Sequence, residues 1–185
     1  MKIWKTKQPT LKEEALLSQI YIRLVDRQDL PALEWDGEYA HFRRLYREVY
    51  QSASQGQALM WMAELASTGI VGQVFVQLNS ARKELADGLK RAYVYGFRVR
   101  PAYQNKGIGS MLLSTIEIDL VKRNFEWVTL NVGRQNTRAR RFYERHGYQI
   151  VASESGDWSY LDELNRRHEV HEPAWRMQKY ILKIC

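Results

Sequence analysis

Phe97-Arg-Val-Arg-Pro-Ala-Tyr-Gln-Asn-Lys-Gly-Ile-Gly109 is the stretch of sequence that decides the fold. It joins an aromatic and β-branched segment, 93–99, to an apolar helical pattern that begins at Ile108. Glycines at 107 and 109 leave the backbone open, so a ligand can approach its N–H groups. The first turn of a helix offers unpaired N–H donors and the positive end of the helix dipole. The stretch therefore predicts a pyrophosphate site, with the charge of Lys106 beside it.

Taken alone, Gly-x-Gly before a helix is weak evidence, because a tight turn with close helix packing explains it equally well. Two other nucleotide sites are disfavoured. The sequence lacks Gly-x-x-x-x-Gly-Lys-Ser/Thr, the P-loop that binds phosphates in many nucleoside triphosphatases. The strand before the glycines belongs to a predicted antiparallel meander over 70–99 and not to a βαβ unit, which argues against a dinucleotide-binding fingerprint.

A second pattern lies about 30 residues further on, in a predicted helix over 136–146. Ala139, Phe142 and Tyr143 fall on one side of this helix, and its arginines, at 138, 140, 141 and 145, fall mostly on the other. Asn136 suits the N-cap of the helix.

Together these patterns resemble the GNAT superfamily of N-acetyltransferases. Val99-x-Pro101-x-x-Gln104-x-x-Gly107-x-Gly109 is similar to the acetyl-CoA signature of that family. Asn136, Ala139, Phe142-Tyr143-Glu144 and Gly147-Tyr148 follow at the usual distance. The resemblance covers about residues 92–152 and implies a GNAT fold with acetyl-CoA as the acyl donor and no metal.

The resemblance also implies roles for individual residues. The strand before the signature should splay from its neighbour and pair its backbone with the pantetheine arm, and the following loop should hold the pyrophosphate through backbone amides. Tyr143 matches a tyrosine that protonates the departing thiolate, although packing in the core is its simpler reading. The implied cofactor-binding residues are Phe97, Arg98, Val99, Gln104, Asn105, Lys106, Gly107, Ile108, Gly109, Ser110, Asn136 and Tyr143, and the implied catalytic residue is Tyr143.

The sequence departs from some relatives at Asn131, where they carry a glutamate that serves as general base. An amide cannot accept the proton of an attacking ammonium group. Glu64 is one substitute, and an acidic and aromatic cluster that would suit a cationic amine is another. The base therefore stays unassigned; the cluster comprises Glu34, Trp35, Asp36, Glu38 and Tyr39.

The order of predicted elements indicates a single mixed α/β domain over 19–185, preceded by an N-terminal arm over 1–18. We expect a central mixed, mostly antiparallel sheet flanked by helices. Strands are predicted at 20–24, 59–65, 70–78, 93–99, 127–132, 148–152 and 175–184. Helices are predicted from about 26, over 39–50, from 108 to about 120 and over 136–146. A long polar loop is expected between 152 and 175.

Composition excludes several classes of protein. With 45% apolar and 26% charged residues, a chain of 185 residues can bury a core. Cys185 is the single cysteine, so no intramolecular disulfide can form. His168 and His171 lack the spacing of zinc proteases. No run of about 18 apolar residues and no apolar leader occurs, so we expect a cytoplasmic protein without a membrane partner.

The formal net charge of +7 attracts anions without choosing among them, and a nucleic-acid partner is disfavoured because charge alone supports it. The leading hypothesis is acetyl transfer from acetyl-CoA to a primary amine of a small molecule or peptide, by direct attack. The alternative, motivated by Asn131, is a non-catalytic acyl-CoA-binding sensor or regulatory module. A homodimer is compatible with either function.

Overall fold

The computed structural model describes residues 11–182, so the first ten residues of the predicted arm and Cys185 lie outside the described part. The strands are β1 Ile20–Leu24, β2 Ala58–Leu65, β3 Gly69–Gln77, β4 Arg91–Val99, β5 Trp127–Gly133, β6 Gln149–Glu154, β7 Asp157–Leu161, β8 Arg167–His171 and β9 Ala174–Tyr180. The α-helices are α1 Leu11–Leu17, α2 Arg43–Ser54, α3 Ile108–Lys122 and α4 Thr137–Arg145, and the 3-10 helices are η1 Arg27–Glu34, η2 Ala40–Phe42 and η3 Pro101–Tyr103.

Seven strands form one sheet in the order β1-β2-β3-β4-β5-β9-β6. Every neighbouring pair is antiparallel except β4 and β5, which run parallel because α3 crosses over between them. The mixed, mostly antiparallel sheet and the antiparallel meander over 70–99, which contains β3 and β4, were both predicted, and both are confirmed.

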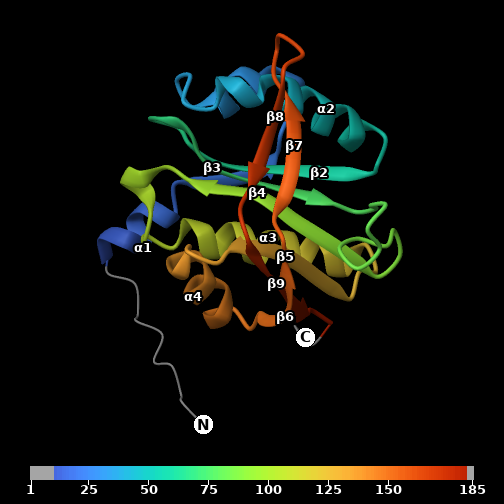
Figure 1. Cartoon of the computed structure of the whole chain (residues 1–185). Helices are drawn as coiled ribbons and strands as arrows, with labels where there is room; N and C mark the ends of the chain where they lie inside the picture. The colour runs from blue at the N-terminus through green and yellow to red at the C-terminus, as the bar shows by residue number, and fades with distance from the viewer. Residues whose placement is uncertain (1–10, 183–185) are drawn as a thin grey trace.

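Helices cover both faces of the sheet (Figure 1). The helix α3 packs on one face through an apolar stripe, and Ile108, Leu112, Ile116 and Leu120 in it are fully buried. On the other face, η1 and α2 enclose a second core that includes Leu33, Tyr46 and Val49, in contact with side chains of β2 and β3. The sheet therefore separates an α3 face from an α2 face.

Part of the predicted arm is the short helix α1. Its Leu16 and Leu17 pack against the core on the α3 face, so residues 11–17 belong to the folded body. Leu17 also lies against the start of α3, where a Cβ built on Gly107 would come within 3.0 Å of its Cδ1 atom.

The prediction of a loop between 152 and 175 was wrong, because this segment contains the hairpin of β7 and β8. The hairpin runs up to α2 (Figure 1), where Tyr160 packs edge-on against Phe42 with ring centroids 4.9 Å apart. Arg47 of α2 also donates a hydrogen bond to Glu163 in the hairpin turn at 2.7 Å. These contacts hold the hairpin beside the α2 face.

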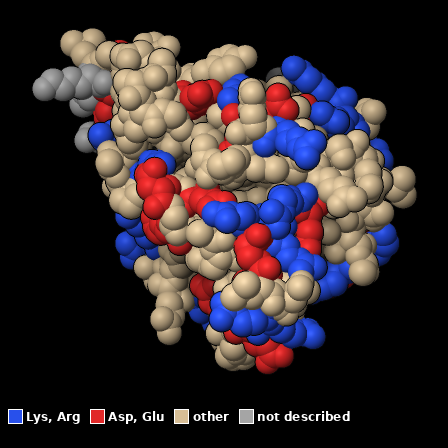
Figure 2. Space-filling view, turned by 90° about the horizontal axis from the view of Figure 1, so that it is seen from above, with Lys and Arg blue, Asp and Glu red and all other residues tan. Residues whose placement is uncertain are grey.

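Many of the basic side chains near α2 are paired with carboxylates. Figure 2 shows arginines and lysines interleaved with acidic side chains on the face seen from above, which carries α2 and the tip of the hairpin. The ion pairs there include Arg43–Glu34, Arg44–Glu48, Arg47–Glu163 and Arg166–Asp162. This pairing offsets much of the positive charge on that face. Within residues 11–182, no helix has the length and apolar character needed to cross a membrane.

Candidate active site

A widening gap between β4 and β5 forms the centre of the site. The two strands pair in parallel over Arg91–Val94 and Trp127–Leu130, and the pairing stops after Val94 although both strands continue. The backbones of 95–99 and 131–133 therefore face a space that no strand of the protein fills in residues 11–182. An extended ligand lying there can form hydrogen bonds with strand edges.

The loop that follows β4 leads from this gap to the start of α3. The Gln104 side chain donates a hydrogen bond to the Val99 carbonyl at 2.9 Å, which holds the loop against the end of the strand. Gly107 then occupies the N-cap of α3 with φ +88°, a left-handed conformation that favours glycine. No side chain from the described residues caps this helix end.

The loop presents free backbone donors. Among the described residues, the N–H groups from 105 to 110 have no hydrogen-bond acceptor, and the first helical bond is from Met111 to Gly107 at 3.0 Å. The exposed Lys106 ammonium lies 5.5 Å from the centre of the Tyr103 ring. The predicted pyrophosphate loop thus has the unpaired amides and the cation that an anion requires.

Ile108 and Gly109 differ in their packing at the start of α3. Ile108 is fully buried, so its side chain anchors the helix start and only its backbone is available to a ligand. A Cβ on Gly109 would lie 3.5 Å from Phe142, at ordinary contact distance. A small side chain would therefore fit at position 109, and the approach of α4 to the start of α3 does not require glycine there.

Aromatic side chains line the gap on the α3 face. Phe97 of β4 packs edge-on against Phe142 and Tyr143 of α4, with centroid separations of 6.0 Å and 6.3 Å. Tyr143 is 8% exposed, and its hydroxyl forms no hydrogen bond with any residue from 11 to 182. Burial raises the pKa of the Tyr143 phenol above its ordinary value, with a smaller effect from Tyr93. Tyr143 is thus a fully protonated donor without a partner beside the gap.

His146 is a residue of this site that the sequence patterns did not single out. Its Nδ1 lies 2.8 Å from the Phe142 carbonyl oxygen, which can only accept, so Nδ1 carries a proton. Its Nε2 lies 3.0 Å from the Ser110 hydroxyl. The imidazole therefore ties the end of α4 to the first turn of α3 and orients Ser110.

Asn136 and Arg138 connect the start of α4 to the site. The Asn136 side chain accepts a hydrogen bond from the Ala139 N–H at 3.0 Å, so its predicted N-cap role is confirmed. Arg138 donates to the Asn105 side chain at 2.9 Å. One of the four arginines of this helix thus reaches the loop between β4 and α3.

Asn131 lies on β5 where the gap opens. Val128, Leu130 and Val132 point to the α3 face, so the alternation of the strand places Asn131 on the α2 face. Its Oδ1 atom is buried and has no hydrogen-bond partner among the described residues. A buried acceptor without a donor is costly, and a ligand that supplies an N–H would satisfy it.

The acidic cluster suggested by the sequence is not a free negative surface. Glu34 accepts hydrogen bonds from Arg43 at 2.6 and 2.7 Å, and these hold the pKa of its carboxyl below the ordinary range. Asp36 pairs with Arg100 at 2.9 Å. Both partners are arginines that sequence spacing could not assign, because they lie 9 and 64 residues away.

The remaining two carboxylates lie beside Tyr39 and Arg23. Glu38 is near the Tyr39 phenol and, after burial, is the second cause of its raised pKa. Glu64, on β2, accepts a hydrogen bond at 3.1 Å from Arg23 of the neighbouring strand β1. Three of the four proposed substitutes for the general base are paired with arginines, and the fourth, Glu38, is exposed beside the Tyr39 phenol.

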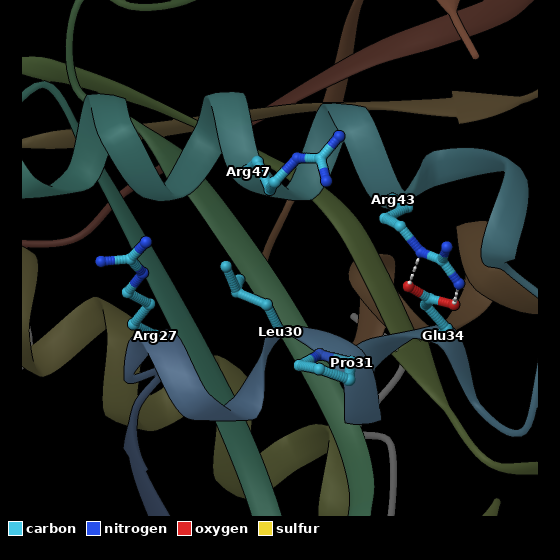
Figure 3. Close-up of a pocket in the computed structure, with 6 residues that line it drawn as sticks. All are labelled: Arg27, Leu30, Pro31, Glu34, Arg43 and Arg47. Atoms are coloured by element: carbon cyan, nitrogen blue, oxygen red, sulfur yellow. Dashed lines mark hydrogen bonds and ion pairs between the residues drawn. The ribbon is translucent and has the colours of Figure 1, made fainter. Parts of the chain in front are cut away.

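A hollow of ≈ 430 Å³ lies between η1 and α2, on the α2 face (Figure 3). It is lined by Arg27, Leu30, Pro31, Glu34, Arg43 and Arg47. The bidentate contact of Arg43 with Glu34 lies at one end, and Arg27 of η1 and Arg47 of α2 line the hollow from its two opposite helices (Figure 3). Its position between these two helices separates it from the start of α3 on the other face of the sheet.

Histidines outside the gap have structural partners. His168 lies 2.9 Å from Asp162, and this contact is the first cause of the lowered pKa of that carboxyl. His171 contacts Asp157. Within residues 11–182, no group of three or more His, Cys, Asp or Glu side chains is arranged to hold a metal ion.

Comparison with known proteins places this geometry in a family. The model of the acetyltransferase (GNAT) family matches residues 26–148, about two thirds of the chain. A mycothiol acetyltransferase from Propionibacterium freudenreichii is 32% identical over 85 residues, which are 46% of this chain and 26% of that protein. The chain thus matches about a quarter of the length of this relative.

Solved structures share the fold. The ribosomal-protein-S18-alanine N-acetyltransferase of Escherichia coli superposes with a TM-score of 0.64, at 21% identity, over 88% of this chain and 94% of that chain. NAA60 of Arabidopsis thaliana, solved with acetyl-CoA, gives 0.66 at 19% identity, over 88% and 98%. The spermidine/spermine N-acetyltransferase SpeG of Vibrio cholerae gives 0.67 at 19% identity, over 91% and 96%. On the family match and the shared fold, this chain belongs to the GNAT family of acetyltransferases.

Proposed function

We propose that this protein transfers the acetyl group of acetyl-CoA to a primary amine. The observation that supports the proposal most is one continuous site: the gap between β4 and β5, the unpaired amides at the start of α3, and Tyr143 beside the gap. Each part matches one part of an acyl-CoA: the extended arm, the pyrophosphate and the thioester sulfur.

The residues of the site fit the cofactor. The N–H groups from 105 to 110, with Lys106, are suited to the pyrophosphate. The backbone of Phe97, Arg98 and Val99 at the edge of the gap is suited to the amides of the pantetheine arm. Asn136 uses its Oδ1 for the N-cap, which leaves its side-chain NH₂ as a donor for the same arm.

When bound, acetyl-CoA supplies an activated acetyl thioester that a neutral amine can attack without a covalent enzyme intermediate. A C–N bond forms, the C–S bond breaks, and one amine proton replaces the acetyl group on sulfur in the overall balance. Tyr143 assists by donating a hydrogen bond to the sulfur as negative charge develops there. Because burial raises its pKa, the phenol stays protonated and can donate throughout the neutral range.

The amine enters from the α2 face in this proposal, and its own deprotonation precedes attack. Asn131 cannot take a proton, Glu34 and Asp36 are bound to arginines, and Glu38 is exposed, so we infer that solvent removes the proton. The ratio kcat/KM should then rise tenfold per pH unit up to the pKa of the amine in solution.

A binding assay with a charge-matched control tests the cofactor site. Saturation with acetyl-CoA at a hundred times its Kd should stabilise the protein by about 2.7 kcal/mol in a thermal-shift experiment. Ser110→Asp should abolish the shift because its carboxylate repels the pyrophosphate, while the same charge suits a helix N-terminus and preserves the fold. Ser114→Asp, at an exposed position one turn further along α3, should keep the shift.

Turnover separates the proposed enzyme from its alternative. Release of CoA in the presence of an amine panel is the expected result. An acetyl-CoA shift without CoA release from any amine would instead support the non-catalytic sensor suggested by Asn131. Equal shifts in the native protein and in Ser110→Asp would contradict the assigned cofactor site.

A homodimer is part of the proposal as well. The strand β6 is an edge of the sheet, and its Ile150 and Val151 are 42% and 44% exposed. A second copy packing on this edge would cover them and pair the open strand. Light scattering on Val151→Lys and on the native chain tests whether this edge holds two copies together.

A further inference from the structure

The side chain of Arg98 lies on the α2 face of the sheet, away from the predicted cofactor loop. A bulge at Gly96, with φ +58°, interrupts the alternation of β4. Phe97 therefore turns toward α4, whereas Arg98 turns toward α2, on the same face as Tyr95. The bulge thus places a guanidinium at the acceptor side of the gap.

Aromatic rings surround this guanidinium. Its Cζ atom lies 4.1 Å from the ring centre of Tyr39 and 5.1 Å from that of Phe42. One nitrogen donates a hydrogen bond to the Tyr46 hydroxyl at 3.0 Å. These contacts fix the planar group and exclude water from part of it.

Arg98 has no carboxylate partner in the described part of the chain, residues 11–182. Only one of its five N–H donors has a protein acceptor there. Glu34 pairs with Arg43 and Asp36 with Arg100, and Glu38 forms no ion pair with Arg98 within residues 11–182. A partly enclosed cation without a carboxylate partner is a site for an external anion.

A second unsatisfied group lies across the gap on the same face. The buried Oδ1 atom of Asn131, on β5, lacks a hydrogen-bond donor, as described above. Opposite Arg98 on β3, the fully buried Gln73 lies near the Tyr46 hydroxyl, yet neither atom of its amide reaches a hydrogen-bond partner of good geometry among the described residues. The α2 face of the gap therefore offers a cation and a hydrogen-bond acceptor on its two sides.

We propose that the acceptor is an amine that also carries a carboxylate. Its carboxylate binds the guanidinium of Arg98, and its amine N–H donates to Oδ1 of Asn131, which directs the nitrogen toward the gap. A carboxylate suits one planar guanidinium, since its single charge and two oxygens match one fork of donors. A polyamine would be repelled by the same group. This inference rests on the proposed acetyl transfer and names its substrate class.

Matched amine pairs test the proposal directly, with CoA release as the readout. Each pair consists of an amino acid and the amine that lacks its carboxylate: L-leucine with isopentylamine, L-phenylalanine with phenethylamine, and β-alanine with ethylamine. Spermidine and phosphoethanolamine complete the panel. We expect kcat/KM at least tenfold higher for the carboxylate-bearing member of a pair at equal concentrations of neutral amine, because a charge-assisted hydrogen bond favours it by about that factor or more.

Variants then assign the effect to the guanidinium. Arg98→Met keeps the length and apolar contact of the side chain and should bring the ratio within each pair to within about threefold of one. Arg98→Lys, which keeps the charge but not the fork, should retain part of the preference. Arg27→Met, an exposed arginine at the start of η1, should leave the ratio unchanged.

The outcomes distinguish this inference from the proposed function. If the protein acetylates no carboxylate-bearing amine, the inference is contradicted. If it prefers spermidine or phosphoethanolamine, the inference is contradicted as well, but the proposed acetyl transfer is supported. If Arg98→Met lowered kcat/KM equally for both members of a pair, the inference would also be contradicted, because the loss of a purely structural role would have that effect. Failure of acetyl-CoA to shift the thermal transition would instead remove the proposed function.

Discussion

Replacing Tyr143 by phenylalanine isolates the hydroxyl group that the proposed mechanism requires. The ring packs against Phe97, Phe142 and Tyr148, and phenylalanine preserves all of these contacts. Because the hydroxyl forms no hydrogen bond with the described residues, its removal should change the free energy of unfolding by less than about 1 kcal/mol.

The kinetic effect should be much larger. A hydrogen bond to a developing thiolate contributes about 1.5 to 3 kcal/mol, and each 1.36 kcal/mol corresponds to tenfold in rate. The value of kcat for Tyr143→Phe should therefore fall by about 10- to 100-fold at saturating acetyl-CoA. Since burial raises the pKa of this phenol, the native enzyme should show no loss of kcat from Tyr143 between pH 7 and pH 9, the proposed range of the assay.

The assay follows CoA release with a thiol reagent, beside thermal unfolding and an acetyl-CoA titration of the same samples. Tyr21→Phe is the control, because Tyr21 on β1 is 64% exposed and far from the gap in the sheet order. If Tyr143→Phe is folded, binds acetyl-CoA and keeps kcat within twofold of the native value, the assigned donor role is wrong and Tyr143 only packs.

Three further predictions concern stability. Gly107→Ala should lower it by about 1 to 2 kcal/mol in urea unfolding, because φ is +88° there; an unchanged midpoint would mean that the loop relaxes freely. Glu117→Leu should lower the free energy of unfolding by about 3 to 5 kcal/mol, because it leaves the Lys179 ammonium without its buried carboxylate partner, which lies 2.6 Å away in the native protein. A smaller loss in the double variant Glu117→Leu with Lys179→Met would identify the unpaired charge as the cause. Arg23 lowers the pKa of Asp29, so this pair should contribute stability above about pH 4 that is lost as pH falls through the folded pKa; Asp29→Asn should flatten the dependence of the melting temperature on pH in that range, and parallel curves would exclude the contribution.

The part of the site that the sequence predicts is the part that local signals encode. The glycines at 107 and 109, the apolar stripe of α3 and the N-cap at Asn136 each depend on residues within one or two turns of the chain. Such signals depend on neighbouring residues more than on the rest of the fold. The loop from 104 to 110 and both helices of the site could therefore be predicted before the sheet was known.

The α2 face could not be predicted in the same way, because distant pairings determine it. Carboxylates that look free in the sequence are bound by arginines such as Arg43 and Arg100. The direction of Arg98 follows from the bulge at Gly96, and an alternating pattern cannot reveal such a bulge. In the hairpin, β7 alternates Trp158 and Tyr160 with polar residues but is only five residues long, and Val170 is the single apolar residue of β8, so the pair gives a weak strand signal.

The short parallel ladder between β4 and β5 also has a consequence for the dynamics of the sheet. The sheet consists of two groups of strands, β1 to β4 and β5, β9 and β6. They are joined by four residue pairs between Arg91–Val94 and Trp127–Leu130. In native-state hydrogen exchange, the two groups of strands should behave as separate cooperative units whose opening energies differ. A ligand bridging the strand edges beyond this ladder would couple the units, so amides far from the gap on both sides should slow together when it binds.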